Sequence, residues 1–273
     1  MHTLRRLRVL CPTCKTGQLA LESSTSSEVQ CAECSVSFPV KDGVIDLLPA
    51  SPRRRSLTQA LMEWKPFIAI YESQWFRKGP GFTLVSRISF DTEYKTVTQA
   101  AKLEGDEILL DLGCGSGIYS RPLAQRLNRG TVVGLDLSVP MLNHASSRAR
   151  SEGLENLLLI HGNALDLPFP DNEFDAVVCC ATIHHFSITD LLRAIIEVHR
   201  VLKPGGHFET SALRNWIPGQ LSKELVDWYY QKIGTNYLRP GDLESLFKQA
   251  GLNSVECHHA KRYWLIMSAV KPV

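Results

Sequence analysis

Residues 107–272 alternate between short apolar runs and longer segments in which apolar residues recur every three or four positions. The runs "EILLDLG", "GTVVGLDLS", "NLLLIHGNA" and "FDAVVCCAT" have the length of buried β-strands. The segments "GIYSRPLAQRL", "VPMLNHASSRARSEG" and "ITDLLRAIIEVHRVLKPGG" have the spacing of amphipathic helices, the last ending at Pro-Gly-Gly. A strand in "HFETSAL" follows, and residues 243–272 predict a helix and two more strands. This alternation predicts an α/β fold in which helices cover both faces of a parallel sheet.

The first hundred residues follow other patterns. Residues 1–48 carry short alternating stretches, such as "VSFPV", that predict a few small strands. The Pro- and Arg-rich segment "PASPRRRS" is typical of a linker. Helical spacing returns in residues 57–72, with an interruption near Pro66, and in residues 91–103. We therefore predict a small module at 1–48, a linker and helical lid at 49–103, and a main domain at 104–273 with a lid insertion at about 212–238.

Length and composition set broad limits on the class of protein. The chain has 273 residues, of which 44% are hydrophobic, so it can bury a sizeable core. Its net charge of +2 makes no strong electrostatic case for nucleic acid. No apolar stretch reaches the ~20 residues needed to span a bilayer, and the N-terminus lacks the apolar core of a signal peptide. We therefore expect a soluble, cytoplasmic protein.

Four of the eight cysteines form two C-x-x-C pairs that are separated by 16 residues. This spacing is in the range of a four-thiolate zinc site, because each tight turn brings two sulfurs together. A redox pair usually stands alone at the head of a helix, and structural disulfides are not expected in a reducing compartment. A module of this size buries little core, so a metal would supply much of its folding free energy. We predict a closed, structural Zn²⁺ site at Cys11, Cys14, Cys31 and Cys34.

The stretch "LLDLGCGSG" at 109–117 follows a predicted strand and opens a predicted helix. Doubly wound folds bind ligands at this position, and glycines let the backbone approach a ligand closely. A dinucleotide fingerprint would require a third glycine where Ile118 stands. Asp136 ends the next strand, which is where such folds place an acceptor for ribose hydroxyls. The loop therefore predicts a nucleotide-like ligand, with an NAD site or a plain tight turn as alternatives.

Four motifs, "ILLDLGCGSGIYSRPLA", "VVGLDLSVPMLNHA", "GNALDLPFPDNEFDAVVC" and "EVHRVLKPGG", occur in order along the chain. Together they resemble the class I S-adenosylmethionine (SAM)-dependent methyltransferases, over about residues 95–273. The resemblance implies a Rossmann-like, seven-stranded sheet whose last strand is antiparallel. It also implies that SAM is the methyl donor.

The resemblance assigns the predicted cofactor site. Asp111, Gly113 and Gly115 would surround the methionine portion of SAM, and Asp136 would hold both ribose hydroxyls. Met141 would pack on the adenine, with Asn163 and Ala164 at the ring edge, although many relatives carry Asp where Asn163 stands. A helix N-cap for Asp136 and a core position for Met141 are the alternatives. The full predicted set is Asp111, Gly113, Cys114, Gly115, Gly117, Asp136, Leu137, Met141, Asn163 and Ala164.

Methyl transfer from a sulfonium is an in-line displacement, so positioning alone can supply ~7–11 kcal/mol in favourable cases. A general base is needed only where the acceptor keeps its proton until late. His184 and His185 in "CCATIHHF" are the candidate bases, with a backbone hydrogen-bonding role as the alternative. The absence of [DN]-P-P-[YF] there argues against methyltransferases that act on the exocyclic amine of adenine or on glutamine. Cys179 and Cys180 are interpreted as buried strand residues.

The cysteine module combined with this methyltransferase pattern resembles two groups: quinone-type methyltransferases of chloroplasts and bacteria, and methyltransferases of a guanine in ribosomal RNA. The lid regions are aromatic, with Trp64, Tyr71 and Trp75 among the residues before the first strand, which suggests a flat or apolar acceptor. We predict a small-molecule acceptor that is aromatic, quinone-like or a natural product. RNA is a weaker partner, because Phe38 is the one aromatic residue in the first 60. A SAM-binding protein whose module serves as a docking surface is the third alternative.

Overall fold

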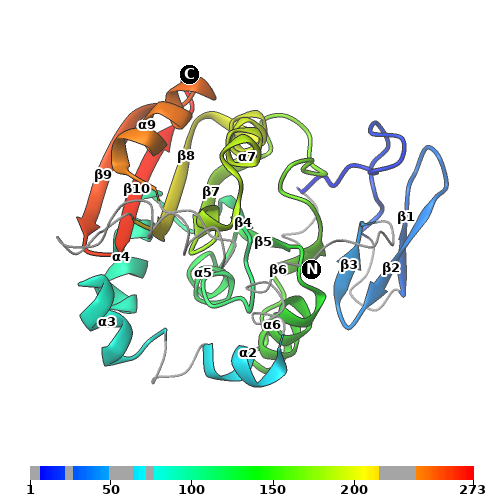
Figure 1. Cartoon of the computed structure of the whole chain (residues 1–273). Helices are drawn as coiled ribbons and strands as arrows, with labels where there is room; N and C mark the ends of the chain where they lie inside the picture. The colour runs from blue at the N-terminus through cyan, green and yellow to red at the C-terminus, as the bar shows by residue number, and fades with distance from the viewer. Residues whose placement is uncertain (1–6, 22–26, 49–63, 72–76, 215–237) are drawn as a thin grey trace.

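The computed structural model describes residues 7–21, 27–48, 64–71, 77–214 and 238–273 (Figure 1). Within these residues the strands form one sheet in the order β1-β2-β3-β6-β5-β4-β7-β8-β10-β9. Its parallel centre and its far edge consist of β4 (Ile108–Leu112), β5 (Thr131–Asp136), β6 (Leu157–His161), β7 (Phe174–Cys180), β8 (Leu202–Leu213), β9 (Asn253–Lys261) and β10 (Trp264–Val270). Strand β10 pairs antiparallel with both β8 and β9. The predicted seven-stranded methyltransferase sheet is confirmed.

Helices cover both faces of the sheet (Figure 1). The helices α4 (Phe90–Ala100), α5 (Ser120–Arg126) and α6 (Val139–Ser151) pack on one face, and α7 (Ile188–Val201) and α9 (Pro240–Gln249) pack on the other. Side chains of Ser89, Ser138 and Ser187 cap α4, α6 and α7 by accepting a backbone N–H of the first turn. The elements α2 (Lys65–Tyr71), α3 (Pro80–Ser86) and the 3₁₀ turn η2 (Ile183–His185) complete the described helices.

One boundary differs from the sequence expectation. Helix α7 ends at Val201, and "LKPGG" belongs to β8, where Gly205 N–H donates to Lys271 O over 2.9 Å. The Pro-Gly-Gly sequence marks an irregular start of the strand, since Pro cannot donate to the ladder. Helix α2 begins at Lys65, so Pro66 lies in its first turn, where proline is tolerated, and Trp64 before it is not helical. Residues 57–63 of the expected helix lie outside the described residues.

The N-terminal module extends the main sheet. Its strands β1 (Glu28–Gln30), β2 (Ser37–Lys41) and β3 (Val44–Asp46) are antiparallel to one another, and β3 then pairs in parallel with β6. Val9, Leu19 and Ile45 belong to the same buried cluster as Phe169 and Phe174 of the main domain. The sequence predicted the small strands but not this continuity. The proposed division at residues 48 and 103 stays a prediction.

No helix in the described ranges has both the length and the apolar character needed to cross a membrane.

Candidate functional site

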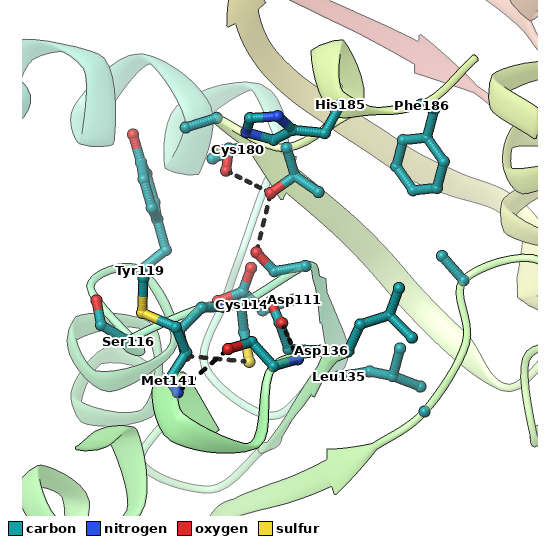
Figure 2. Close-up of a pocket in the computed structure, with 18 of the residues that line it drawn as sticks. Asp111, Cys114, Ser116, Tyr119, Leu135, Asp136, Met141, Cys180, His185 and Phe186 are labelled. Atoms are coloured by element: carbon teal, nitrogen blue, oxygen red, sulfur yellow. Dashed lines mark hydrogen bonds between the residues drawn. The ribbon is translucent and has the colours of Figure 1, made fainter. Parts of the chain in front are cut away.

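A cavity of about 360 Å³ opens at the carboxyl ends of β4, β5 and β7 (Figure 2). This volume is within the usual range for small-molecule sites, and the strand order reverses between β4 and β7 as it does at ligand sites of doubly wound folds. The predicted cofactor residues that line the cavity are Asp111, Gly113, Cys114, Gly115, Asp136, Leu137, Met141, Asn163 and Ala164. The structure therefore brings together residues that the sequence places as far apart as 53 positions, from Asp111 to Ala164.

The glycine loop between β4 and α5 closes tightly against the end of β7. Gly113 has a φ of +72°, and a Cβ atom there would lie 2.2 Å from Cγ2 of Thr182. The Thr182 hydroxyl donates to Gly113 O over 3.0 Å. Gly117 also has a positive φ, of +78°, but it packs against Ala145 of α6 and does not line the cavity. The glycines thus have two different roles, close approach in the cavity wall and helix packing behind it.

Asp136 stands at the end of β5 with its carboxylate oriented by the backbone. Gly115 N–H donates to Oδ2 over 2.8 Å and Ser138 N–H donates to Oδ1 over 2.7 Å. Burial raises the pKa of Asp136 from its ordinary value, and these two hydrogen bonds oppose that effect. A carboxylate offers about four lone-pair sites, so two backbone donors leave acceptor capacity for a pair of hydroxyl groups. The geometry fits the predicted contact with a ribose.

Asp111 lines the cavity from β4 and is 2% exposed. Burial raises the pKa of its carboxyl to about 7, while a hydrogen bond from the Ser120 hydroxyl lowers it. A cationic group placed in the cavity would favour the ionised form of this carboxyl. This suits the predicted neighbourhood of an amino-acid ammonium.

Met141 lies in α6, which follows β5, and Asn163 lies in the loop after β6; both line the cavity. Met141 is 6% exposed in the first turn of α6, and Ser138 Oγ accepts its N–H. Asn163 Oδ1 accepts the Leu165 N–H over 3.1 Å, so the side chain stabilises the turn of the loop in which it lies. The sequence did not predict this second role for the amide. Ala164 and Leu165 complete that wall.

The two candidate bases have different surroundings. His185 is open to the cavity, and desolvation by the surrounding protein lowers its pKa to about 4 (Figure 2). His184 is 5% exposed, does not line the cavity, and its Nδ1 accepts Leu213 N–H over 3.4 Å. Burial lowers the pKa of His184 well below its ordinary value. The geometry therefore gives His184 the backbone-binding role and leaves His185 as the one candidate base beside the cavity.

Several residues of the cavity wall were not singled out as site residues by sequence reasoning. Ser116 and Tyr119 lie in or just after the glycine loop and Thr182 just after β7, whereas Phe186 follows η2 and Asp190 lies in the first turn of α7. Tyr71, predicted as a lid aromatic, also lines the cavity, whereas Trp64 is exposed. Trp75 and the lid segment 215–237 lie outside the described residues. Burial raises the pKa of Cys180, which therefore stays a thiol, as the buried-strand interpretation predicts.

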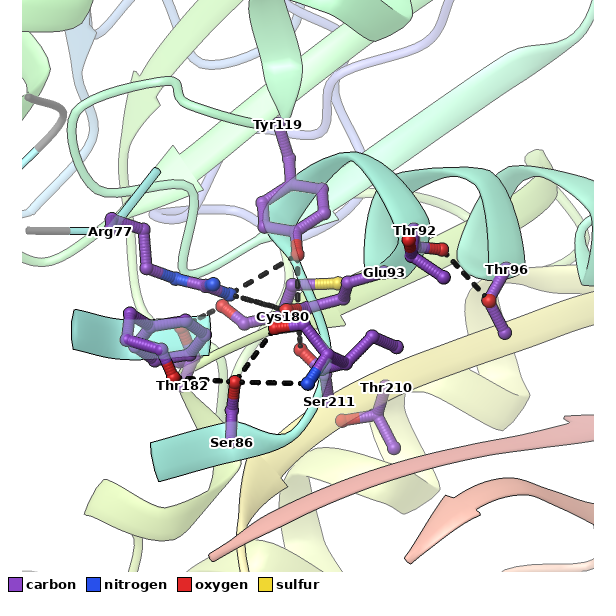
Figure 3. Close-up of polar contacts among 12 residues, drawn as sticks. Arg77, Ser86, Thr92, Glu93, Thr96, Tyr119, Cys180, Thr182, Thr210 and Ser211 are labelled. Atoms are coloured by element: carbon purple, nitrogen blue, oxygen red, sulfur yellow. Dashed lines mark hydrogen bonds and ion pairs between the residues drawn. The ribbon is translucent and has the colours of Figure 1, made fainter. Parts of the chain in front are cut away.

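A buried polar network supports the wall that contains Tyr119 (Figure 3). Glu93 of α4 accepts hydrogen bonds from Arg77 over 2.9 Å, from Tyr119 over 2.5 Å and from Ser211 over 2.7 Å. The Arg77 guanidinium also stacks on the Phe82 ring at 4.1 Å. Arg77 is 2% and Glu93 0% exposed, so removal of either partner would leave a buried charge, at a cost of about 3–5 kcal/mol.

The four module cysteines converge on one point. Their Sγ atoms all lie within 4.8 Å of one another, with 3.6 Å between those of Cys11 and Cys34 and 3.7 Å between those of Cys14 and Cys31. A tetrahedron with Zn–S bonds of about 2.3 Å has sulfur–sulfur edges of about 3.8 Å. Gly17 N–H and Cys34 N–H donate to Sγ of Cys14 and Cys31, which suits thiolate ligands. The donor set and its spacing fit a structural zinc ion.

Comparison with known proteins agrees with this geometry. The profile of the family described as "Methyltransferase domain" matches residues 109–206. Demethylmenaquinone methyltransferase of Symbiobacterium thermophilum is 33% identical over 182 residues, which are 57% of this chain and 71% of the relative. The protein of that name from Geobacillus stearothermophilus is 38% identical over 113 residues, which are 41% of this chain and 47% of the relative. The chain thus spans between about half and seven tenths of the length of these curated relatives.

Solved structures show the same fold at low sequence identity. Phosphoethanolamine N-methyltransferase 2 of Haemonchus contortus, in complex with SAM, has a TM-score of 0.65 at 18% identity and covers 82% of this chain and 62% of its own. The [4+2]-cyclase SpnF has a TM-score of 0.60 at 20% identity, and the alignment covers 81% of this chain and 98% of the SpnF chain. The chain belongs to the class I SAM-dependent methyltransferases. It is a SAM-dependent methyltransferase whose curated relatives include the demethylmenaquinone methyltransferases.

Proposed function

We propose that this enzyme transfers the methyl group of SAM to a ring carbon of a quinone-like hydroquinone. The observation that carries the proposal is the 33% identity to a demethylmenaquinone methyltransferase over 71% of that relative. The lining of the cavity supports it, because Tyr71, Tyr119 and Phe186 contribute aromatic side chains to the wall. Flat, apolar rings are the ligands that such a surface binds best.

In the proposed complex, Asp136 binds the ribose hydroxyls and the glycine loop approaches the methionine portion. Asp111 faces the ammonium group, and Met141 and Ala164 enclose the adenine. When bound, SAM supplies a methyl group on a positively charged sulfur, and the carbon–sulfur bond breaks as the new carbon–carbon bond forms. The sulfur keeps the electron pair of the broken bond and becomes a neutral thioether.

His185 would serve the acceptor. Its low pKa keeps the imidazole neutral at physiological pH, so a ring nitrogen can accept the hydrogen bond of an acceptor hydroxyl. Withdrawal of that proton raises the electron density at the neighbouring ring carbon, which then attacks the methyl group. Loss of the ring proton from the methylated carbon to water restores the aromatic ring as a phenolate. The protonated His185 then returns its proton to the phenolate oxygen, which gives the hydroquinone and the neutral imidazole. The net products are the methylated ring, S-adenosylhomocysteine and one proton.

The test is transfer of label from methyl-labelled SAM. Purified enzyme is incubated with a demethylated naphthohydroquinone, a matched phenol that lacks the second hydroxyl, and total RNA. We expect label on a ring carbon of the hydroquinone and none in RNA, with Asp136→Ala as the inactive control. Label in RNA, or no label in any hydroquinone tested, would contradict the proposed acceptor.

We also propose that Cys11, Cys14, Cys31 and Cys34 hold a structural Zn²⁺, since four thiolates leave no open coordination position. Metal analysis should find about one zinc per chain. Cys31→Ser should lose the zinc, whereas Cys257→Ser, at an exposed cysteine of β9, should retain it. Equal zinc content in the two variants would contradict the site.

A further inference from the structure

The residues on either side of the first C-x-x-C turn both contact one short loop of the main domain. Leu10, just before Cys11, donates its N–H to Pro168 O over 2.8 Å. Lys15, just after Cys14, forms an ion pair with Asp166 at 2.6 Å. We name residues 162–168 the wall loop. The wall loop thus has two contacts with the first cysteine turn, besides those of Leu167 with Glu197 and Arg200 of α7.

The module makes a second contact at the start of the wall loop. Asp46 of β3 pairs with His161 of β6, with 2.7 Å between Oδ1 and Nδ1, and both side chains are partly buried. Leu47 N–H donates to His161 O over 3.1 Å. In the sheet, Asp46, His161 and Asp136 lie side by side in register on three neighbouring strands. A module residue is therefore two strands away from the proposed ribose-binding carboxylate.

The other side of the wall loop faces the cavity. Gly162, Asn163, Ala164 and Leu165 line it, and Gly162 N–H donates to Asp136 O over 3.0 Å. In Figure 1 the module lies against the β6 edge of the sheet, beside this loop. The same short segment thus contacts the cysteine module on one side and forms the proposed adenine side of the cavity on the other.

We propose that the four-cysteine module is the outer support of the cofactor cavity, and that metal bound by its cysteines raises the affinity of the enzyme for SAM. Asp46 is a positioning residue that orients His161. The inference rests on the proposed cofactor and zinc sites. Without metal the cysteine turn samples more conformations, and SAM binding must then order the wall loop as well, which costs conformational entropy.

The first experiment measures both directions of this coupling. SAM affinity is measured by calorimetry on the zinc-loaded protein and on protein stripped by a chelator, with circular dichroism to confirm that the main domain stays folded. We expect stripping to weaken SAM binding at least about fivefold. By linkage, saturating SAM should raise the zinc affinity by the same factor, as measured by competition with a chromogenic chelator.

The outcomes separate this inference from the proposed sites. Equal SAM affinity with and without zinc would overturn the coupling alone. Zinc-loaded protein that binds no SAM would contradict the cofactor site itself, and protein that binds no zinc would contradict the metal site. In either of the last two cases the coupling also fails.

The second experiment leaves the metal in place. Asp46→Ala should weaken SAM binding several-fold at unchanged zinc content, because His161 loses its partner beside the wall loop. Asp46→Asn should restore most of the affinity, since its carbonyl oxygen can still accept from the His161 ring. Glu28→Ala, at an exposed acid on β1, is the matched control and should bind SAM like the wild type. If Ala and Asn variants both bind SAM like the wild type, Asp46 has no positioning role.

Discussion

The backbone N–H of Gly115 donates to Oδ2 of Asp136 over 2.8 Å, which joins the glycine loop to the end of the neighbouring strand. The two sequence motifs that the family resemblance treats as separate contacts are therefore one unit. The acid orients the loop, and the loop in turn fixes the carboxylate for a ligand. A change at either residue should affect both contacts.

Asp136→Ala should lower SAM affinity by about 100-fold or more, because hydrogen bonds to a charged group contribute about 1.5–3 kcal/mol each and two ribose hydroxyls lose their acceptor. Calorimetric titration with SAM measures the effect. The exposed Asp106, in the loop before β4, provides a control, and Asp106→Ala should bind normally. A wild-type dissociation constant for Asp136→Ala would exclude it from the cofactor site.

Gly113→Ala and Gly153→Ala distinguish close approach from backbone strain. Both glycines have positive φ, +72° at Gly113 and +68° at Gly153. A Cβ at Gly113 would lie 2.2 Å from Thr182, whereas one at Gly153 meets no atom within 4 Å. Gly153→Ala should therefore cost only the ~1–2 kcal/mol of left-handed strain. Gly113→Ala should lower the free energy of unfolding, measured with urea, by more than Gly153→Ala does, and it should also abolish SAM binding. Equal losses of stability in the two variants would contradict the close approach of Gly113 to Thr182.

The sheet could be predicted from the sequence because its information is local. The central strands are apolar runs, as in "EILLDLG", and a glycine follows β4 and β6 while an acid ends β5. The convergence of Asp111 and Asp136 followed from the rule that parallel strands end at one edge. The seven-strand order with an antiparallel β10 needed the family resemblance as well.

The remaining features depend on contacts between distant residues. Asp46 and His161 are 115 positions apart, and the short run "GVIDLLP" shows no sign that β3 continues the main sheet. Glu93 reads as a solvent-facing acid in an amphipathic helix, yet Arg77 and Ser211 bury it. His184 and His185 are indistinguishable in sequence, and the 3₁₀ turn alone turns one away from the cavity. For Asp46 and Glu93, a pairing between distant segments overrides the local pattern.

The buried carboxyl of Glu209 on β8 should make the free energy of unfolding depend on pH. It is 0% exposed, neither carboxyl oxygen has a hydrogen-bond partner among the described residues, and burial raises its pKa to about 9. Glu256 on β9 adds to this increase. Between about pH 4.5 and 9 the unfolded chain releases this proton and the native state keeps it, so the free energy of unfolding falls as pH rises.

Glu209→Gln should remove that slope, so the variant should gain stability relative to the wild type between pH 5 and pH 8.5. Urea unfolding at the two pH values measures the difference. Glu244→Gln, at an exposed acid paired with Lys248 on α9, should change stability by less than about 1 kcal/mol at either pH. A Glu209→Gln advantage that is the same at both pH values would show that the carboxyl titrates normally.

Substitution of His184 should mainly lower the stability of the protein, whereas substitution of His185 should mainly lower the rate of methyl transfer. His185 faces the cavity, so His185→Ala should lower the rate of methyl transfer to the acceptor by about 100-fold, the lower end of the contribution expected from a positioned base. His184 accepts the Leu213 N–H in the core, so His184→Ala should lower the melting temperature and leave the rate per folded molecule nearly unchanged. Because the pKa of His185 is about 4, the wild-type pH–rate profile should show no inflection near the ordinary histidine pKa of about 6.5. Equal rate losses in both variants would contradict these roles, and an inflection near pH 6.5 that disappears in His185→Ala would contradict the lowered pKa of His185.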